Sequence, residues 1–350
     1  MIFNNMKYIF ITILLISSFT NAKSLIDKYP AYNYVLSEFD IETGYIYDYE
    51  FEEFVTKNEK KLLRFYNHSI ARGDYFIPII KNGLLNNNLS DLLVYLSIVE
   101  SGLKSDIKSH KKAVGLWQFM PSTAKHYNLE VDKCFDDRCD PYLATKAAIK
   151  HLKHLYHKFG AWYLAIIAYN CGEGRLAKAI KKAKTDDLRT LIDNDTKLLP
   201  KETRDYIRKI ILLAMIGESS NISFDKTYPN LVKVEVGGGT NLKTIAKLID
   251  MSYKKLLQIN GKYKKGKIPT QKYSYEIFIP ESKMVTFYKN YLLPPRIIQK
   301  HLLVSYHVKL GDTLETIAKK FHTSIEDIKL TNNITDDFLT LDQLLVIPTD

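Results

Sequence analysis

The order of apolar and polar positions predicts helices over the middle of the chain, in residues 89–220. Residues 90–101 (SDLLVYLSIVES) begin with a serine suited to an N-cap, and Gly102 follows them as a helix-ending residue. Residues 140–160 open with Asp-Pro and then place apolar residues at helical spacing. Residues 161–170 (AWYLAIIAYN) are nearly all apolar, which predicts a buried central helix.

The first 88 residues give a weaker pattern. Residues 1–22 combine Lys7, the apolar run YIFITILLISSF and the small-residue end TNA, which is typical of a cleaved export signal. The apolar run is shorter than the roughly 20 residues of a membrane-spanning helix, so we expect cleavage, with an uncleaved anchor as the alternative. Residues 23–88 hold short apolar stretches and many Tyr and Asn residues, and we expect an irregular, partly helical region there.

The chain changes character after residue 220, where one segment occurs twice. Residues 242–260 and 314–332 share seven identities without a gap, which is an internal repeat. Each copy follows a short β-like run and a Gly-containing turn, and each is followed by a strand that ends in Ile-Pro. We therefore predict two units with the order strand, helix, helix, strand, joined by a linker over residues 282–300.

Composition agrees with a globular protein of several domains. The chain has 350 residues, of which 46% are hydrophobic and 25% charged, and this length favours two or three domains. Its formal net charge of +11 attracts polyanions in general. The sequence has no zinc finger, RNA-binding signature or dense arginine stripe, so a nucleic-acid partner is not expected.

No cofactor or metal site is expected. Cys134 and Cys139 are close enough in sequence to close a small loop, which would leave Cys171 over. The cysteine spacing does not supply a set of four zinc ligands. Three histidines of the 140–160 helix are predicted to face solvent, opposite its apolar stripe. They are His151, His154 and His157.

Three motifs carry the candidate chemistry: VESGLKSDIKSHKKAVGLWQFMPSTA from Val99, AYNCGEGR from Ala168 and LPKETRDYI from Leu199. In this order and spacing they resemble the catalytic domain of the lytic transglycosylases, which cleave peptidoglycan and have a lysozyme-like helical fold. This resemblance covers about residues 89–217. The second repeat, in residues 305–348, resembles the LysM module, which binds glycans that contain N-acetylglucosamine.

The resemblance makes Glu100 the catalytic acid and base. A carboxyl group near Leu96, Ile98 and Leu103, at a predicted helix end, is expected to keep its proton to a higher pH than usual. Without the surrounding motifs, an exposed helix-end glutamate is the simpler interpretation. In the family the acid later takes a proton from the C6 hydroxyl of muramic acid, so a second carboxylate is not required. Asp106 is the nearest one after it in sequence.

The resemblance also assigns substrate-binding residues in the catalytic domain. They are Ser109, Gln118, Tyr169, Asn170 and Tyr206. Tyr169 could instead be a core tyrosine, and Trp117 suits core packing as well as a sugar-facing role. For Glu202 we favour a structural role over a substrate contact. Lys112 stands where the family has a glycine, which leaves the local loop geometry open.

For the second repeat, the resemblance places glycan-binding residues in two turns. They are Gly311, Asp312, Thr313 and Asn332. Backbone amides and small polar groups in these turns suit an N-acetyl group. Asp342 replaces a glycine common in the module, and the earlier copy carries a long lysine-rich insertion. The earlier copy can therefore be a degenerate unit kept for packing.

These inferences predict a mainly α protein, with a lysozyme-like helical catalytic domain followed by small α+β (βααβ) LysM-like modules. The expected parts are a signal peptide (1–22), a helical or irregular region (23–88), the catalytic domain (89–220), a degenerate LysM-like repeat (228–281), the linker (282–300) and a LysM module (301–349).

The expected function is that of a peptidoglycan lytic transglycosylase. It would cleave the β-1,4 bond between N-acetylmuramic acid and N-acetylglucosamine and form 1,6-anhydromuramic acid. Two alternatives are a muramidase-type hydrolase on the same fold and a non-catalytic wall-binding protein. The expected partners are peptidoglycan glycan strands, with a monomer in the periplasm of a Gram-negative envelope. Membrane association is expected only if the N-terminal segment stays uncleaved.

Overall fold

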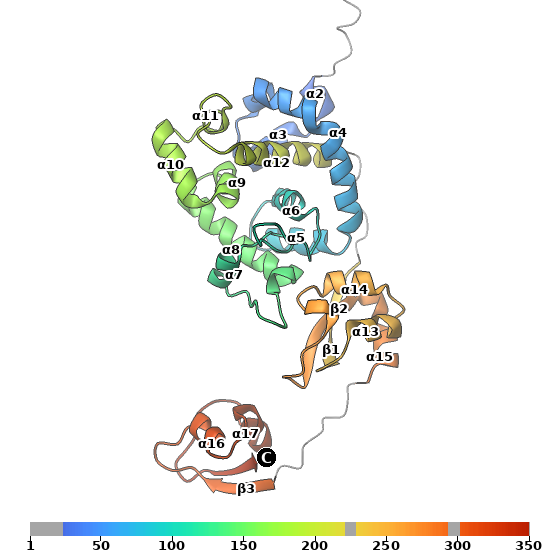
Figure 1. Ribbon diagram of the computed structural model, residues 1–350, viewed down its shortest axis with the longest axis vertical. Coiled ribbons are helices and arrows are strands. Elements are labelled where there is room, and N and C mark those ends of the chain that lie inside the picture. The colour runs from blue at the N-terminus through green and yellow to red at the C-terminus, as the bar shows by residue number, and fades with distance from the viewer. Residues whose placement is uncertain (1–23, 221–228, 293–301, 350) are drawn as a thin grey trace, which may run out of the picture. The chain divides into compact units, whose positions relative to one another are not determined.

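The computed structural model describes residues 24–220, 229–292 and 302–349 (Figure 1). The export signal predicted for residues 1–22 lies outside these ranges. The chain divides into two units, residues 1–292 and 293–350. The first unit holds a helical domain and a strand-containing module, and the second unit holds another module. Within the described ranges, no helix has both the length and the apolar character that crossing a membrane requires.

The helical domain is built from helices of very different lengths. Its α-helices are α2 (Leu25–Lys28), α3 (Tyr32–Glu38), α4 (Tyr49–Arg72), α5 (Phe76–Leu85), α6 (Val94–Ser101), α7 (Pro121–His126), α8 (Pro141–Phe159), α9 (Trp162–Cys171), α10 (Glu173–Ala183), α11 (Leu188–Ile192) and α12 (Lys201–Ser219). Its 3-10 helices are η1 (Thr43–Tyr47), η2 (Asp91–Leu93) and η3 (Asp137–Cys139).

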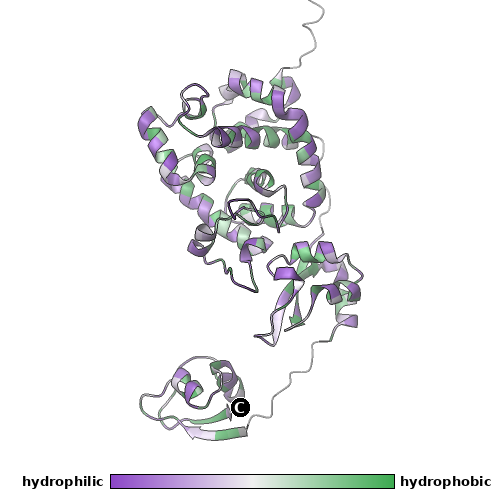
Figure 2. Ribbon diagram, in the orientation of Figure 1, coloured by the Kyte–Doolittle hydropathy of each residue, from purple (hydrophilic) through white to green (hydrophobic). Residues whose placement is uncertain are grey.

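Helix α12 forms the centre of the core of this domain. It begins directly after Pro200, and most of its 19 residues are buried. Helices α3, α4, α6 and α9 pack against it. Figure 2 shows hydrophobic residues concentrated on the inner helices, whereas α10 is mostly hydrophilic. The apolar surface that α12 shares with its neighbours is thus the main source of stability of the domain.

The predicted helix boundaries around α6, α8 and α9 are confirmed. Ser90 accepts a hydrogen bond from a backbone N–H at the start of η2. Helix α6 ends at Gly102, whose φ of +58° is the left-handed conformation that glycine adopts at low cost. Asp140 caps α8 by accepting hydrogen bonds from two backbone N–H groups of its first turn. These short-range signals set the start of η2, the end of α6 and the start of α8.

The region before residue 89 is more regular than the sequence predicted. It contains α4, a helix of 24 residues that Asp48 caps. Val35, Phe51 and Ile80 of this region are buried in the same apolar core as α6 and α12. The helices expected there are present, and less of the region is irregular than expected because its apolar positions pack against α8 and α12, which lie far away in the sequence.

The first module has the predicted order of strand, helix, helix and strand, followed by one more helix. Its elements are β1 (Leu231–Gly237), α13 (Leu242–Leu248), α14 (Tyr253–Ile259), η4 (Lys264–Gly266), β2 (Ser274–Pro280), η5 (Glu281–Lys283) and α15 (Met284–Asn290). The two strands are antiparallel, with Leu231 opposite Pro280. Phe287 of α15 is 1% exposed within the module's core. Residues 284–290 were therefore wrongly predicted as linker, because they fold onto α13.

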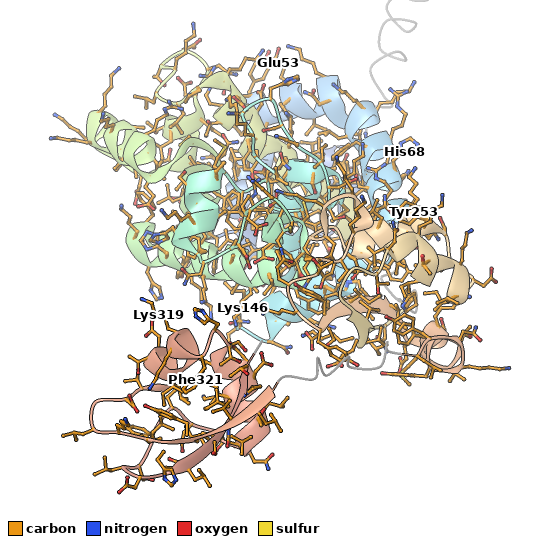
Figure 3. The ribbon with its side chains drawn as sticks, turned by 60° about the horizontal axis from the view of Figure 1, so that its bottom comes forward. Glu53, His68, Lys146, Tyr253, Lys319 and Phe321 are labelled. Carbon is orange, nitrogen blue, oxygen red and sulfur yellow. The ribbon has the colours of Figure 1, made fainter. Side chains whose placement is uncertain are left out.

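The second module repeats this architecture in fewer residues. Its elements are β3 (Leu302–His307), α16 (Leu314–Lys320), α17 (Ile325–Asn332) and β4 (Leu344–Thr349). The strands are antiparallel, with His307 opposite Leu344. Ile317, Ile328 and Ile347 form its core, and Phe321, labelled in Figure 3, packs against them.

One asparagine at the same position of the repeat holds each module together. Asn260 donates its side-chain amide to the carbonyls of Leu256 and Phe278, and it accepts a hydrogen bond from the Phe278 N–H. Asn332 makes the same three bonds in the second module, at 2.7 to 2.8 Å. Each side chain thereby ties the end of the second helix to the closing strand.

We expect Asn332→Ala to lower the free energy of unfolding of the second module by about 2 kcal/mol. The change removes three hydrogen bonds and leaves the N–H of Val346 without its side-chain acceptor. Amide hydrogen exchange of β4 in the full chain measures the effect and should become faster. Thr331→Ala, an exposed neighbour on the same helix, is the control. Equal exchange rates in the two variants would contradict the prediction.

Candidate active site

Glu100 lies at the C-terminal end of α6, beside α12. The left-handed Gly102 turns the chain away from the helix just after this residue. The hydroxyl of Tyr206, on α12, donates a hydrogen bond to Glu100 Oε1 at 2.6 Å. Tyr206 is buried and Glu100 is half-buried. The structure thus brings together two predicted site residues that are 106 positions apart in the sequence.

Burial raises the pKa of Glu100 from 4.5 to about 7. The hydrogen bond from Tyr206 favours the charged form and lowers this pKa, whereas the negative charge of Glu202 raises it. Burial outweighs the hydrogen bond. Near neutral pH the carboxyl group is therefore divided between its protonated and ionised forms, which suits a group that first donates and then accepts a proton.

Tyr169, at the end of α9, connects the site to a neighbouring loop. Its hydroxyl donates a hydrogen bond to the carbonyl of Trp117 at 2.7 Å. Burial and the negative charge of Glu100 hold the pKa of Tyr169 well above 10, so the phenol stays neutral. Trp117 is fully buried, and its Nε1 donates to Thr145 Oγ1 at 3.1 Å. Of its two interpretations, core packing is therefore correct.

Residues 107–119, here called the Gln118 loop, are fixed by local hydrogen bonds. Gln118 donates its side-chain amide to the carbonyls of Ile107 and Gly115, at 3.2 and 2.9 Å. Ser109 Oγ accepts a hydrogen bond from the Ala113 N–H at 3.0 Å. Two predicted substrate-binding residues thus also determine the shape of the loop that carries them.

Asn170 joins two helices of the site. Its Oδ1 accepts a hydrogen bond from Thr203 Oγ1 at 2.8 Å, which links the end of α9 to the first turn of α12. The bonds of Ser109, Gln118 and Asn170 described here are all within the protein. Substrate binding by these three residues therefore stays a prediction.

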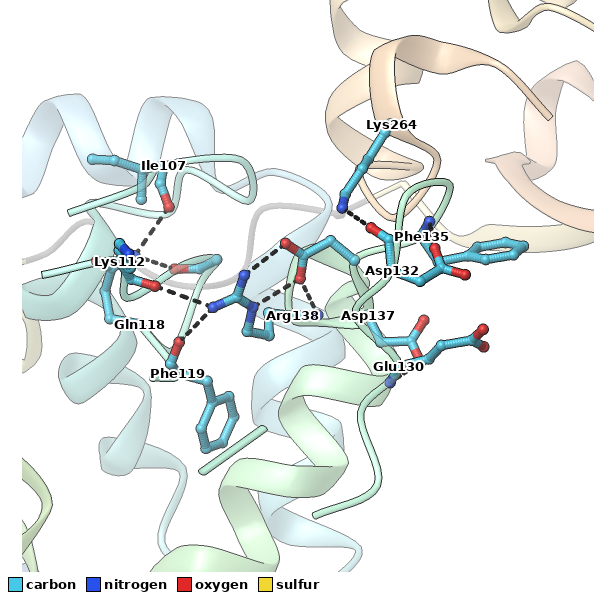
Figure 4. A network of polar contacts seen from close by, with 12 residues as sticks. Ile107, Lys112, Gln118, Phe119, Glu130, Asp132, Phe135, Asp137, Arg138 and Lys264 are labelled. Atoms are coloured by element: carbon cyan, nitrogen blue, oxygen red, sulfur yellow. Dashed lines mark hydrogen bonds and ion pairs between the residues drawn. The ribbon is translucent and has the colours of Figure 1, made fainter. Parts of the chain in front are cut away.

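Arg138 is bonded to the backbone of the Gln118 loop (Figure 4). The sequence analysis did not identify this residue. Its Nη1 donates hydrogen bonds to the carbonyls of Lys112 and Phe119, at 3.1 and 3.3 Å. Its Nε and Nη2 donate to the Asp136 carboxylate, each at 2.8 Å. Lys112 has a φ of +67°, the left-handed conformation for which the family's glycine is suited. Arg138 thus holds the strained part of the loop in place.

Glu202 was harder to place from sequence, and the structure puts it at the N-terminal end of α12. A negative charge is favoured there by the helix dipole. Its carboxylate lies 3.6 Å from Lys111 Nζ, and the two side chains are 74% and 79% exposed. So exposed an ion pair contributes little stability. The structural role favoured for Glu202 therefore stays a prediction, and its charge also acts on Glu100.

His151 was wrongly predicted to face solvent. It is half-buried, and its Nδ1 lies 3.0 Å from the hydroxyl of Tyr127. The error has a geometric cause, because position 151 is three residues after Ala148 and four before Leu155, on the apolar face of α8. Burial lowers the pKa of His151 to about 4, so its ring is neutral at physiological pH. The other two histidines of α8 are exposed, as predicted.

The predicted glycan-binding residues of the second module have mostly internal roles. Asp312 accepts hydrogen bonds from the Tyr306 hydroxyl and a backbone N–H. Thr313 is the N-cap of α16 in a capping box. Gly311 supplies a φ of +90°. Because the Asn332 amide is bonded to backbone groups, we assign this residue a structural role, and glycan binding by the turns stays a prediction.

Comparison with protein families assigns the three parts of the chain. Residues 77–192 match the transglycosylase SLT domain. Residues 230–295 match the LysM-like domain of the lytic transglycosylase MltD, and residues 306–348 match the LysM domain. By its SLT domain the chain belongs to the lytic transglycosylases. The predicted fold class, mainly α with small strand-containing modules, is confirmed.

The chain is homologous to the membrane-bound lytic murein transglycosylase D of Escherichia coli K12. The two are 29% identical over 312 residues, which cover 84% of this chain and 68% of the relative. The peptidoglycan transglycosylase gp16 of Escherichia phage T7 is 36% identical over 126 residues, 35% of this chain and 9% of that protein. Among solved structures, the 70 kDa soluble lytic transglycosylase of E. coli aligns with 40% of this chain and 24% of its own, at 21% identity and a TM-score of 0.34.

We expect Glu100→Gln to make the helical domain more stable than wild type above pH 7. The folded protein holds the Glu100 proton up to a pKa of about 7, whereas the unfolded chain releases it near 4.5. Wild type therefore loses stability as the pH rises through this window, by up to about 3 kcal/mol, and the neutral glutamine does not.

Denaturant unfolding of both proteins at pH 4 and pH 8 measures this difference. It should be small at pH 4 and largest at pH 8. Glu52→Gln, on the exposed side of α4, controls for the removal of one negative charge. A gap between Glu100→Gln and wild type that is the same at both pH values would exclude the raised pKa as its cause.

Proposed function

We propose that this protein is a peptidoglycan lytic transglycosylase. It cleaves the β-1,4 bond between N-acetylmuramic acid and N-acetylglucosamine and leaves a 1,6-anhydromuramic acid end. The observation that carries the proposal is Glu100, a half-buried carboxyl group with a pKa of about 7, which Tyr206 holds inside the SLT domain. Homology to a lytic murein transglycosylase supports the substrate class.

In the first step Glu100 acts as the acid. Its proton passes to the glycosidic oxygen while the bond from this oxygen to C1 of muramic acid breaks. The bonding electrons stay with the oxygen, which leaves as the C4 hydroxyl of N-acetylglucosamine. Positive charge develops on the muramic acid ring, next to the new Glu100 carboxylate. The hydrogen bond from Tyr206 stabilises this carboxylate at the moment it forms.

In the second step Glu100 acts as the base. Its carboxylate takes the proton of the C6 hydroxyl while this oxygen attacks C1 and closes the anhydro ring. The acid is thereby restored, and no water is consumed. One carboxyl group that changes between its two forms near neutral pH is sufficient for both steps.

A muramidase-type hydrolase is the second candidate, and Glu202 is the observation that favours it. Within the described residues, Glu202 is the one carboxylate whose charge acts on the pKa of Glu100. A hydrolase needs such a second group to activate water or to attack the sugar. The Glu202 side chain is however 74% exposed and ion-paired with Lys111, so we favour the transglycosylase.

We infer that the second module binds the glycan strand. The turn after β3 and the turn before β4 leave the sheet at the same end, since the strands are antiparallel. Leu310 and Phe338 in these turns are about nine-tenths exposed, at 92% and 88%. Exposed apolar side chains at one end of the sheet suit the apolar faces and N-acetyl methyl groups of sugars. The module would thereby keep the enzyme on its polymer.

We propose that the protein works as a monomer in the periplasm. The homologous protein of E. coli is described as membrane-bound. Peptidoglycan is the expected partner, and both the SLT domain and the LysM match agree with it. Membrane attachment would depend on residues 1–22, for which cleavage is expected.

We expect Glu100→Gln to lower turnover of purified sacculi by at least about a thousandfold, because an amide can neither donate nor accept this proton. Wild type should release fragments with the anhydro mass, which is one water less than the hydrolysis product. Mass spectrometry of the digests measures both effects. Glu202→Gln should keep the anhydro product.

Each alternative gives a different result in the same assay. Fragments with reducing ends, lost in Glu202→Gln, would identify a muramidase. Wild type that pulls down sacculi without releasing fragments would identify a binding protein. Glu100→Gln should still be retained on sacculi, because the second module is unchanged. Activity that survives this substitution would refute the role of Glu100.

We expect Tyr206→Phe to move the basic limb of the pH–rate profile to higher pH, by about one unit. The Tyr206 hydroxyl lowers the pKa of Glu100, so its removal lets the acid stay protonated to higher pH. The dependence of kcat/KM on pH measures the shift. Tyr169→Phe is the control, because that hydroxyl bonds to the carbonyl of Trp117 and not to Glu100. A basic limb that moves equally in both variants would contradict the assignment.

A further inference from the structure

The first module is attached to the helical domain by β-structure and aromatic contacts. Phe135 and Tyr263 pair as antiparallel residues, through backbone hydrogen bonds of 3.0 and 3.1 Å between their neighbours. Their ring centroids are 5.7 Å apart. Tyr142 stacks on Phe278 with a centroid distance of 4.5 Å and an interplanar angle of 20°. Directional contacts of this kind fix one relative position of the two parts.

Two polar contacts of the same interface involve buried groups. Ser105, which has no exposed surface, donates its hydroxyl to the carbonyl of Gln258 at 2.7 Å. Lys262 Nζ lies 3.3 Å from Asp140 Oδ2, and the two side chains are only 18% and 3% exposed. Loss of the lysine would leave a buried carboxylate without its cation, which is costly. Separation of the two surfaces would therefore leave Ser105 and Asp140 without these partners.

The two surfaces also approach each other closely. A Cβ atom built on Gly261 would lie 3.0 Å from the carbonyl oxygen of Cys139, which is tighter than an ordinary van der Waals contact. Cys139 is a free thiol, as is Cys134, so the small loop that these cysteines could have closed is not cross-linked. The segment is instead held in shape by its contacts with the module.

This segment, residues 132–140, here called the docking loop, is in direct contact with the Gln118 loop. Figure 4 shows both ends of the connection, with Lys264 of the module bonded to the carbonyl of Asp132 and Arg138 bonded to the Gln118 loop. A Cβ atom on Gly115 would lie 1.8 Å from the carbonyl oxygen of Arg138. Surfaces packed this closely cannot shift independently.

The turn that would bind glycan in this module is covered by its own insertion. The backbone N–H of Ile268 donates to Thr240 and that of Gly239 donates to Pro269, at 2.9 and 3.0 Å. Asn241 pairs with Lys267 as a β-bridge. These bonds use backbone groups of the turn at residues 238–241, which corresponds to residues 310–313 of the second module. The first module is therefore poorly suited to a second glycan site.

We propose that the first module, residues 229–292, is a brace that positions the Gln118 loop for catalysis. It acts through the docking loop, and Lys262 is the positioning residue whose ion pair with Asp140 keeps the brace closed. The dependence of turnover on this ion pair rests on the proposed function. The mechanical part, that the module restricts motion of the Gln118 loop, does not.

Two variants of the full chain open the interface in different ways. Lys262→Met removes the cation, and Gly261→Leu inserts a side chain against Cys139. Lys262→Arg keeps the charge and tests for rescue. Lys255→Met, at an exposed position of α14, is the matched control for the loss of one lysine. The readouts are amide hydrogen exchange of residues 107–119, and kcat and KM on soluble glycan strands.

We expect faster exchange of residues 107–119 in both opening variants, and a loss of kcat of about tenfold with KM changed less than about twofold. Lys262→Arg and Lys255→Met should resemble wild type in both readouts. A wild-type kcat in both opening variants overturns the proposal, whatever the exchange shows. If wild type has no activity that depends on Glu100, the proposed function fails. In that case hydrogen exchange alone tests the brace, and unchanged exchange of residues 107–119 in both opening variants would overturn it.

Discussion

The burial of one carboxyl group at the end of α6 is the constraint on which the site depends. Removing Glu100 from water disfavours its charged form, and this raises its pKa to about 7. A helix C-terminus adds unpaired carbonyls and a partial negative charge, which disfavour the anion further. The surrounding helices must therefore supply enough apolar contact to offset an unfavourable position. The buried length of α12 and its neighbours supplies it.

The candidate site is built from two kinds of structure, three core helices and the Gln118 loop. Helices α6, α9 and α12 carry Glu100, Tyr169 and Tyr206, whose positions follow from core packing. The Gln118 loop buries the side chains of Leu116, Trp117 and Phe119 in the core of the helical domain. Its backbone is held by polar bonds as well, among them those of Arg138. The donor of these hydrogen bonds, Arg138, belongs to the docking loop, and the docking loop contacts the first module. The position of the Gln118 loop therefore depends on both.

The sequence was sufficient wherever a signal acts over a few residues. Caps such as Asp140 and stops such as Gly102 gave the helix ends, and the repeat gave the βααβ order of both modules. Long-range packing was not readable in the same way. The N-terminal helices, α15 and Arg138 contact residues that lie far from them in the sequence. Local pattern therefore made the N-terminal region look partly irregular, placed α15 in a linker and gave no signal for Arg138. His151 was different, because there a wrong choice of helix face caused the error.

The two modules show how one scaffold can be given two uses. Asn260 and Asn332 make the same bonds between helix and closing strand, so the fold has been kept in both. What differs is the connection between the second helix and that strand. In the first module the inserted residues bond to the turn at 238–241. The same connection between α14 and β2 also carries Lys262 and Tyr263, which lie at the interface with the helical domain. An insertion that covers a binding turn and at the same time builds a docking surface would convert a glycan-binding unit into part of the catalytic unit in one change.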